Sequence, residues 1–260
     1  MSLRSVEVTR YITPLREGGS LPAIVDADDG FSYVLKFRGA GQGVRALIAE
    51  LIGGELARVL GHKVPEIVFA EVDPAFGRTE PDEEIQDLLK ASAGLNLALH
   101  YLNGALNYDP AVSPVDAVLA SKIVWLDAII TNVDRTARNT NMLMWHRELW
   151  LIDHGASLYF HHSWDNWEAQ SHKPFVNIKD HVLLKWASEL EAADRECRAL
   201  LTEPVIRNVV SLIPDEWMQQ DETYGIPAAQ KEVYVKFLCN RVAASPIITK
   251  AAIDARQSGI

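Results

Sequence analysis

Three polar side chains in the second half of the chain, Asp134, Asn139 and Asp153, have the types and spacing that phosphoryl transfer requires. Asp134 and Asn139 lie in one polar loop, and Asp153 begins the run Asp153-His154-Gly155. Two short apolar runs between the loop and Asp153 predict a β-hairpin, which brings the three side chains together. In phosphoryl transfer one Asp orients the attacking hydroxyl, while an Asn and another Asp hold Mg²⁺ against the nucleotide phosphates. We therefore interpret Asp134 as the orienting residue, and Asn139 and Asp153 as metal ligands.

The spacing from Asp134 to Asn139 equals the D-x-x-x-x-N of the kinase catalytic loop, and Asp153-His154-Gly155 stands where D-F-G would, with His154 at the Phe position. A polar turn that merely caps a hairpin is the alternative for the first motif alone. The predicted helix before the loop, the hairpin, and the D-x-G after it together favour the functional interpretation.

Lys36 is the candidate cation for the nucleotide phosphates. It lies in the apolar and aromatic strand 33–37, where a long cation needs a partner. The helix expected from Val44 offers Glu50 and Glu55, and a strand Lys paired with a helix Glu positions the α- and β-phosphates in kinases. An edge-strand Lys that reaches solvent is the alternative. Two residues five apart on a helix face roughly 140° apart, so only one of these glutamates can meet Lys36.

These residues resemble the motifs of HipA-family kinases, within the protein-kinase-like and phosphoinositide-kinase-like superfamily. The resemblance covers about residues 14–155 and rests on Lys36, Glu50, Asp134, Asn139 and Asp153-His154-Gly155. It favours Glu50 over Glu55, because the family places its Glu eight residues before the Arg of a Leu-Ala-Arg run, here Leu56-Ala57-Arg58. The resemblance implies ATP and Mg²⁺ as cofactors. It also implies a protein Ser or Thr as acceptor, with a small-molecule or lipid hydroxyl as the alternative.

The resemblance further implies a phosphate-covering loop at residues 16–20, in which Gly18, Gly19 and Ser20 bind the nucleotide. HipA-like kinases phosphorylate a Ser in this loop themselves, and Ser20 stands at the comparable place. A plain hairpin turn is the alternative for this segment. The chain has no His-Arg before Asp134 and no Ala-Pro-Glu after Asp153, so peptide docking of the ordinary protein-kinase kind is not implied.

A second glycine-rich segment, Gly39-x-Gly41-x-Gly43, offers a competing interpretation as an NAD(P)-binding loop. It follows one strand, precedes a helix and is followed by another strand, as in a dinucleotide-binding unit. Val44 stands where the third glycine should be, and Lys36 lies in the centre of a strand that should be apolar on both faces. Both features count against this interpretation, and an NAD(P)-binding enzyme is kept as an alternative to the kinase.

The elements that position these residues change character along the chain. Strands are expected over 6–12, 21–25, 31–37, 67–72 and 94–102, and a hairpin over 142–145 and 149–152. Helices are expected over 44–60, 114–131, 179–199, 204–213 and 227–244, with a short helix ending at 90. This order predicts an α+β protein with the bilobal protein-kinase-like fold. Residues 1–100 would form a β-rich N-lobe ending in a hinge at 94–102, and residues 101–260 a mostly helical C-lobe.

Composition limits the partners of the chain. It has 260 residues, of which 48% are apolar, and can bury a large core without cross-links. Its 25 basic and 35 acidic residues give a net charge of −10, which argues against binding to nucleic acid or to an anionic membrane. Only two cysteines are present, and no signal peptide or membrane-spanning run is recognisable, so a cytoplasmic location is expected. A non-catalytic nucleotide-binding regulator on the same fold is the second functional interpretation.

Overall fold

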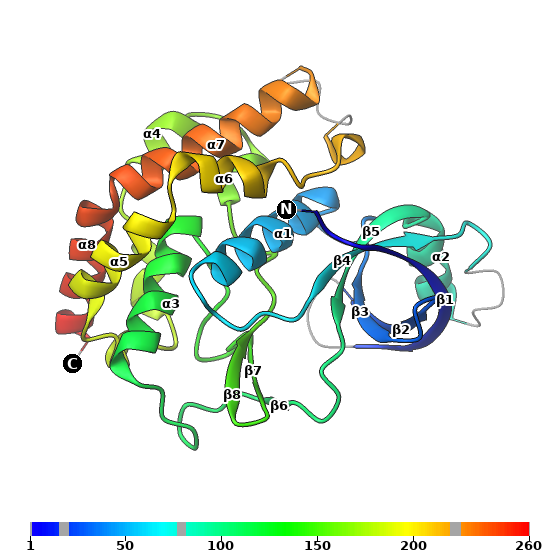
Figure 1. The fold of residues 1–260 in the computed structure, drawn as a ribbon, viewed down its shortest axis with the longest axis horizontal. Coiled ribbons are helices and arrows are strands. Elements are labelled where there is room, and N and C mark those ends of the chain that lie inside the picture. Colours follow the sequence, from blue (N-terminus) through cyan, green and yellow to red (C-terminus); the bar gives the residue numbers. More distant parts are fainter. Residues whose placement is uncertain (1, 16–20, 77–81, 219–224, 260) are drawn as a thin grey trace.

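The computed structural model describes residues 2–15, 21–76, 82–218 and 225–259, and Figure 1 shows a barrel beside a group of helices. The barrel strands follow the order β1-β2-β3-β5-β4, in which only β1 and β4 are parallel neighbours. Their bounds are β1 (Ser5–Pro14), β2 (Ala23–Ala27), β3 (Ser32–Lys36), β4 (Ile67–Val72) and β5 (Gly94–His100). Gly18, Gly19 and Ser20, which we predict to cover the nucleotide, lie outside the described residues.

The strands of the barrel carry one buried and one more exposed face. Alternate residues of β2 and β3 are buried, as expected when one face of a strand meets a core. Gly30 has a φ of 82° in the turn between these strands, where glycine avoids the strain of a left-handed backbone. The helix α2 (Glu83–Ala91) packs Ile85 and Leu89 against the same interior. The strands β2 and β3 therefore form a hairpin with Gly30 in its turn.

The helical half contains the helices α3 to α8, between residues 117 and 258, and a small sheet lies beside them. The helices are α3 (Ala117–Ile130), α4 (Trp167–Ser171), α5 (Leu190–Leu200), α6 (Glu203–Val210), α7 (Pro227–Ala243) and α8 (Ser245–Ser258). The sheet contains β6 (Leu106–Asn107), β7 (Met142–Trp145) and β8 (Glu148–Leu151) in that order. Within the described ranges, no helix combines the length and apolar character needed to cross a membrane.

The helix α1 (Val44–Val59) lies between the barrel and the helical half (Figure 1). Its residues from Leu47 to Ala57 are all buried, and its apolar side chains share one core with those of α3 and α7. The interior of the barrel forms a second core. A helix covered on every side carries Glu50 into the protein interior, where a carboxylate needs a charged or hydrogen-bonding partner.

The α+β class is confirmed, and three helix predictions need correction. The helix α5 begins at Leu190, not at 179, because two 3₁₀ turns occupy Val176–Asp180 and Leu184–Trp186. Between them His181 is extended, and its ring contacts Asp127 of α3. The helix α3 begins at Ala117, not at 114, because Asp116 is its N-cap and its carboxylate accepts from two backbone N–H groups. The last predicted helix ends at Ala243, and a further helix, α8, follows.

Candidate active site

Lys36, the last residue of β3, connects the barrel to the rest of the candidate site. Its Nζ donates to Glu50 Oε2 at 2.8 Å and to Asp153 Oδ1 at 2.5 Å. Burial opposes the charged ammonium, but the two carboxylates outweigh it and raise the pKa of Lys36 above its ordinary value. The side chain is therefore held as a cation between α1 and the Asp153 loop.

Glu50, not Glu55, is the glutamate that meets Lys36. The side chain of Glu50 is fully buried, and burial by itself raises its pKa. The Lys36 ammonium lowers the pKa by more than burial raises it, so the net shift is downward. Glu55 lies on another face of α1, where its Oε1 accepts from Arg58 Nε at 3.2 Å. The spacing argument that only one of the two can contact Lys36 agrees with this geometry.

The loop after α3 holds Asp134 by two amides. α3 ends at Thr131, which adopts a left-handed conformation with a φ of 56° and turns the chain into the loop. Asp134 Oδ2 then accepts from Asn139 Nδ2 at 2.8 Å and from Asn141 Nδ2 at 3.2 Å. Both bonds use Asp134 Oδ2, and the first uses Asn139 Nδ2, so these bonds do not engage Asp134 Oδ1 or Asn139 Oδ1. Asn141 was not among the predicted site residues, although it stands two residues after Asn139.

The predicted hairpin returns the chain to Asp153. β7 and β8 pair through a two-residue turn in which His146 and Arg147 both have positive φ, as in a type I′ turn. Asp153 has a φ of 56°, a conformation that Asp and Asn adopt more readily than other non-glycine residues. Its side chain is 44% exposed, in contrast with that of Glu50. The exposed carboxylate is thus available to a ligand in a way that Glu50 is not.

Arg135 was not among the predicted site residues. Its buried side chain connects the Asp134 loop to the Asp153 loop. Its Nε donates to Asp127 Oδ2 at 2.6 Å. Its Nη1 donates to the backbone oxygens of Asn141 and Ile152, the latter at 3.3 Å. Since Ile152 directly precedes Asp153, one fully buried guanidinium supports the backbone of both loops.

Asp127 of α3 is the anion that balances this buried arginine. It also accepts from Asn132 Nδ2 at 3.0 Å and from His181 Nε2 at 2.9 Å. The Leu183 N–H donates to His181 Nδ1, which places the ring proton on Nε2. Burial raises the pKa of Asp127, but the Arg135 charge and the His181 hydrogen bond outweigh it and lower the pKa. His181 therefore has a polar role in the protein interior.

His154, at the Phe position of the D-F-G-like run, packs directly on α1. It is completely buried, and its Nδ1 lies 3.8 Å from Glu50 Oε1. A Cβ atom at Gly53 would lie 2.6 Å from the His154 Cβ, so only glycine permits this approach. The contact fixes the Asp153 loop against the helix that carries Glu50.

The topology rules out the dinucleotide interpretation of Gly39-x-Gly41-x-Gly43. A dinucleotide-binding unit needs β3 and β4 as parallel strands joined by α1. In the structure β5 lies between β3 and β4 and pairs antiparallel with both. The Gly39–Gly43 segment is therefore a connection from the barrel to α1, and this alternative prediction was wrong.

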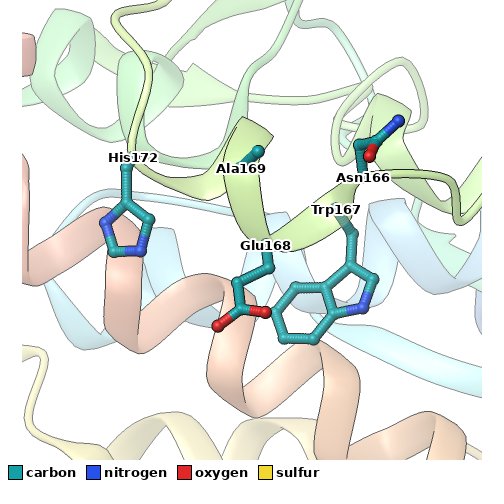
Figure 2. A pocket seen from close by; sticks show the side chains of 5 residues that line it. All are labelled: Asn166, Trp167, Glu168, Ala169 and His172. Atoms are coloured by element: carbon teal, nitrogen blue, oxygen red, sulfur yellow. The ribbon is translucent and has the colours of Figure 1, made fainter.

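A surface pocket also opens along α4, outside the predicted site. Figure 2 shows its lining by Asn166, Trp167, Glu168, Ala169 and His172. None of these residues was predicted to take part in phosphoryl transfer, and the Lys36 ion pairs do not involve them.

The predicted metal ligands, Asn139 and Asp153, are of the chemical type that magnesium prefers. The Asp153 carboxylate and the Asn139 amide offer hard oxygen ligands, which Mg²⁺ prefers. In the part of the chain that the structure describes, no group of three His, Cys, Asp or Glu side chains could hold an ion by itself. Magnesium is usually held by one or two protein oxygens together with substrate phosphates, so this small set is of the expected kind.

A barrel whose Lys36 pairs with a helix Glu, followed by D-x-x-x-x-N, a hairpin and D-x-G, defines a protein with a kinase-like fold. A model of the HipA-like kinase family matches residues 8–245, and the chain belongs to this family. The resemblance found in the motifs is thereby confirmed, and the family supports a kinase-type phosphotransferase. A search of curated proteins found no match.

A solved structure shares the fold at low sequence identity. The chain superposes on the crystal structure of a Helicobacter pylori proinflammatory kinase, CtkA, with a TM-score of 0.59 and 12% identity, covering 97% of this chain and 98% of that chain. Two structures of the Golgi casein kinase are also similar at 12% identity. One has a TM-score of 0.48 and covers 96% of this chain and 72% of that chain. The other, with Mn/ADP bound, has a TM-score of 0.46 and covers 96% and 73%.

Proposed function

We propose that this chain is an ATP-dependent kinase that transfers the γ-phosphate to a hydroxyl group. The observation that carries the proposal is the pair of contacts from Lys36 Nζ to Glu50 and Asp153. A lysine held in this way can bind the α- and β-phosphates of a nucleotide. The accessible carboxylate beside it, that of Asp153, can bind the metal ion that accompanies those phosphates. The kinase family to which the chain belongs supports the same reaction.

Each residue then has a distinct part. Lys36, held by Glu50, neutralises charge on the α- and β-phosphates. Asn139 and Asp153 hold Mg²⁺, which when bound neutralises the charge that develops on the transferred group. Asp134 orients the acceptor hydroxyl and accepts its proton, and Asn139 and Asn141 hold that carboxylate through Oδ2. The hinge after β5 would accept the adenine by backbone hydrogen bonds, between the two lobes of a bilobal kinase.

The acceptor that we favour is a Ser or Thr of a protein, on the resemblance to HipA-family kinases alone. A small-molecule hydroxyl is the alternative acceptor. Neither nucleic acid nor a membrane is needed for the reaction, and the net charge of −10 gives no broad electrostatic attraction to either.

The test is transfer of label from γ-labelled ATP in the presence of Mg²⁺, with a protein lysate and with a mixture of small hydroxyl compounds. We expect labelled product from the wild-type chain and none from Asp134→Asn, which keeps the shape of the side chain but not its charge. The matched control is Asp254→Asn on exposed α8. Nucleotide binding without transfer by the wild type would favour the regulator, and no binding of Mg-ATP would contradict the proposal.

A further inference from the structure

A 3₁₀ turn of the helical half, Asp215–Trp217, crosses to the outer side of the barrel. The Trp217 side chain is buried, and its Nε1 donates to the Leu95 backbone oxygen of β5 at 3.0 Å. Its ring meets Phe69 of β4 edge-on, with the ring centroids 5.7 Å apart. The two halves of the molecule are therefore in contact at a place that the catalytic motifs do not include.

The turn is held from the other side by α7. Lys231 Nζ lies 2.6 Å from Asp215 Oδ1, and the buried Gln230 donates through Nε2 to the Met218 backbone oxygen at 2.9 Å. Trp217 lies between these two attachments. Its position against the barrel is thus set by a long helix rather than by a free loop.

Strand register connects the Trp217 contact to Lys36. Phe69 of β4 is paired with Leu97 of β5, and Leu97 is paired in turn with Lys36 of β3. Paired residues on neighbouring strands point to the same face, so these three side chains form one row across the sheet. Leu97 belongs to the core that contains α1, which shows that the row faces the helical half. Neighbouring strands lie about 4.8 Å apart, so the row is roughly 10 Å long.

We propose that Trp217 is a positioning residue for Lys36, a role that rests on the proposed kinase function. Lys36 is carried by the barrel, whereas Asp153 is carried by the helical half. The distance between them depends on how the barrel packs against the helices. Trp217 contacts Phe69 at one end of the row, and Lys36 is the residue at the other end. Lys36 is assigned to the α- and β-phosphates, so a shift of the barrel that moves it should weaken the binding of ATP and raise its KM.

The kinetic test compares Trp217→Leu with Trp217→Phe. Leu removes both the ring contact with Phe69 and the hydrogen bond to Leu95, whereas Phe keeps an aromatic ring and loses only the bond. We expect Trp217→Leu to raise the KM for ATP about tenfold while kcat falls no more than about threefold. The KM of Trp217→Phe should be much closer to that of the wild type. Loss of folded protein alone would lower kcat and leave KM unchanged, and that result would overturn the proposal.

A second measurement does not depend on enzymatic activity. Sparse acetylation with acetic anhydride, followed by mass spectrometry, reports the reactivity of Lys36 relative to the exposed Lys250. Loosening its two carboxylate contacts exposes the Lys36 amine to the reagent, so we expect labelling of Trp217→Leu about tenfold faster than wild type.

The control for both measurements is Trp186→Leu, a half-buried tryptophan of the helical half that stacks with Lys185. Its Lys36 labelling and KM should match the wild type. If Trp217→Leu does not fold, Trp217→Phe decides by itself, with an expected increase of about twofold to threefold in Lys36 labelling. Unchanged labelling in a folded Trp217 variant overturns the positioning role, whereas a wild type without transfer activity but with this labelling pattern would count against the kinase proposal alone.

Discussion

Lys36 and Asp153, 117 residues apart in the sequence, form a direct ion pair with 2.5 Å between Nζ and Oδ1. The two carboxylates around Lys36 differ in access, because the side chain of Glu50 is fully buried and that of Asp153 is 44% exposed. Glu50 is therefore suited to hold the lysine in every step, and Asp153 to exchange this contact for a bound cation.

We expect Asp153→Asn to lower kcat by about a thousandfold or more, since loss of a metal ligand removes several kcal/mol of charge stabilisation. Asn tolerates the positive φ of this residue, and the side chain is not part of the core, so the fold should persist. The measurement is label transfer from γ-labelled ATP, with thermal unfolding followed by circular dichroism. A folded Asp153→Asn with near wild-type transfer would contradict the metal assignment.

Glu50→Gln should lower kcat/KM by about a hundredfold, because Lys36 then loses its buried anionic partner. Glu55→Gln is the matched control on the same helix, since Glu55 pairs with Arg58 and not with Lys36. We expect the control to change kcat/KM by less than about threefold, although it should cost about 1 kcal/mol of stability through the altered buried hydrogen bond. A larger kinetic effect of Glu55→Gln than of Glu50→Gln would mean that Glu55 supports the site.

Part of the site could be predicted from the spacing of the motif residues. Helix periodicity showed that only one of two glutamates could meet Lys36, and the resemblance to HipA-family kinases chose Glu50. Two apolar runs predicted the hairpin between Asp134 and Asp153. These features depend on residues close in sequence, or on regular elements whose faces are fixed by geometry. The catalytic roles of the same residues stay predictions until the variants are measured.

The buried supports of the site could not be predicted in this way. Asp127 and His181 are 54 residues apart, and neither belongs to a sequence motif that would indicate its partner. His181 also interrupts the periodicity that suggested one helix over 179–199, because its ring turns inward to Asp127. Trp217 looks like an ordinary core aromatic in the sequence, and only strand register relates it to Lys36.

Arg135→Met should destabilise the protein by about 3–5 kcal/mol, because it leaves Asp127 as a buried carboxylate without its arginine. Arg135→Lys keeps the charge but not the fork that reaches both loop carbonyls, so we expect a milder loss of stability and about a tenfold lower kcat. Urea unfolding and label transfer measure the two effects. Arg138→Met, at an exposed position of the same loop, should change stability by no more than about 0.5 kcal/mol. Equal stability of the Met variants at 135 and 138 would contradict a supporting role for Arg135.

Buried His62 should make the free energy of unfolding depend on pH. His62 is buried, and burial together with the nearby Arg135 charge lowers its pKa to about 4, even though Asp127 acts in the opposite direction. In the unfolded chain the pKa of a histidine is about 6.5, so between these values the unfolded state binds more protons than the folded state. The stability that His62 contributes is therefore complete above pH 6.5 and is lost as the pH falls toward 4.

We expect the free energy of unfolding to decrease from pH 6.5 to 4.5, and His62→Gln to remove up to about 1.4 kcal/mol per pH unit of that slope. His161, whose burial lowers its pKa well below 6.5, acts with the same sign, so part of the slope should persist in the variant. Carboxylates with lowered pKa values, such as Asp127, act mainly below this range. The measurement is urea unfolding at several pH values, with His172→Gln, an exposed histidine beside α4, as the control. A slope for His62→Gln as steep as that of the control would show that His62 is protonated in the folded protein and would contradict the prediction.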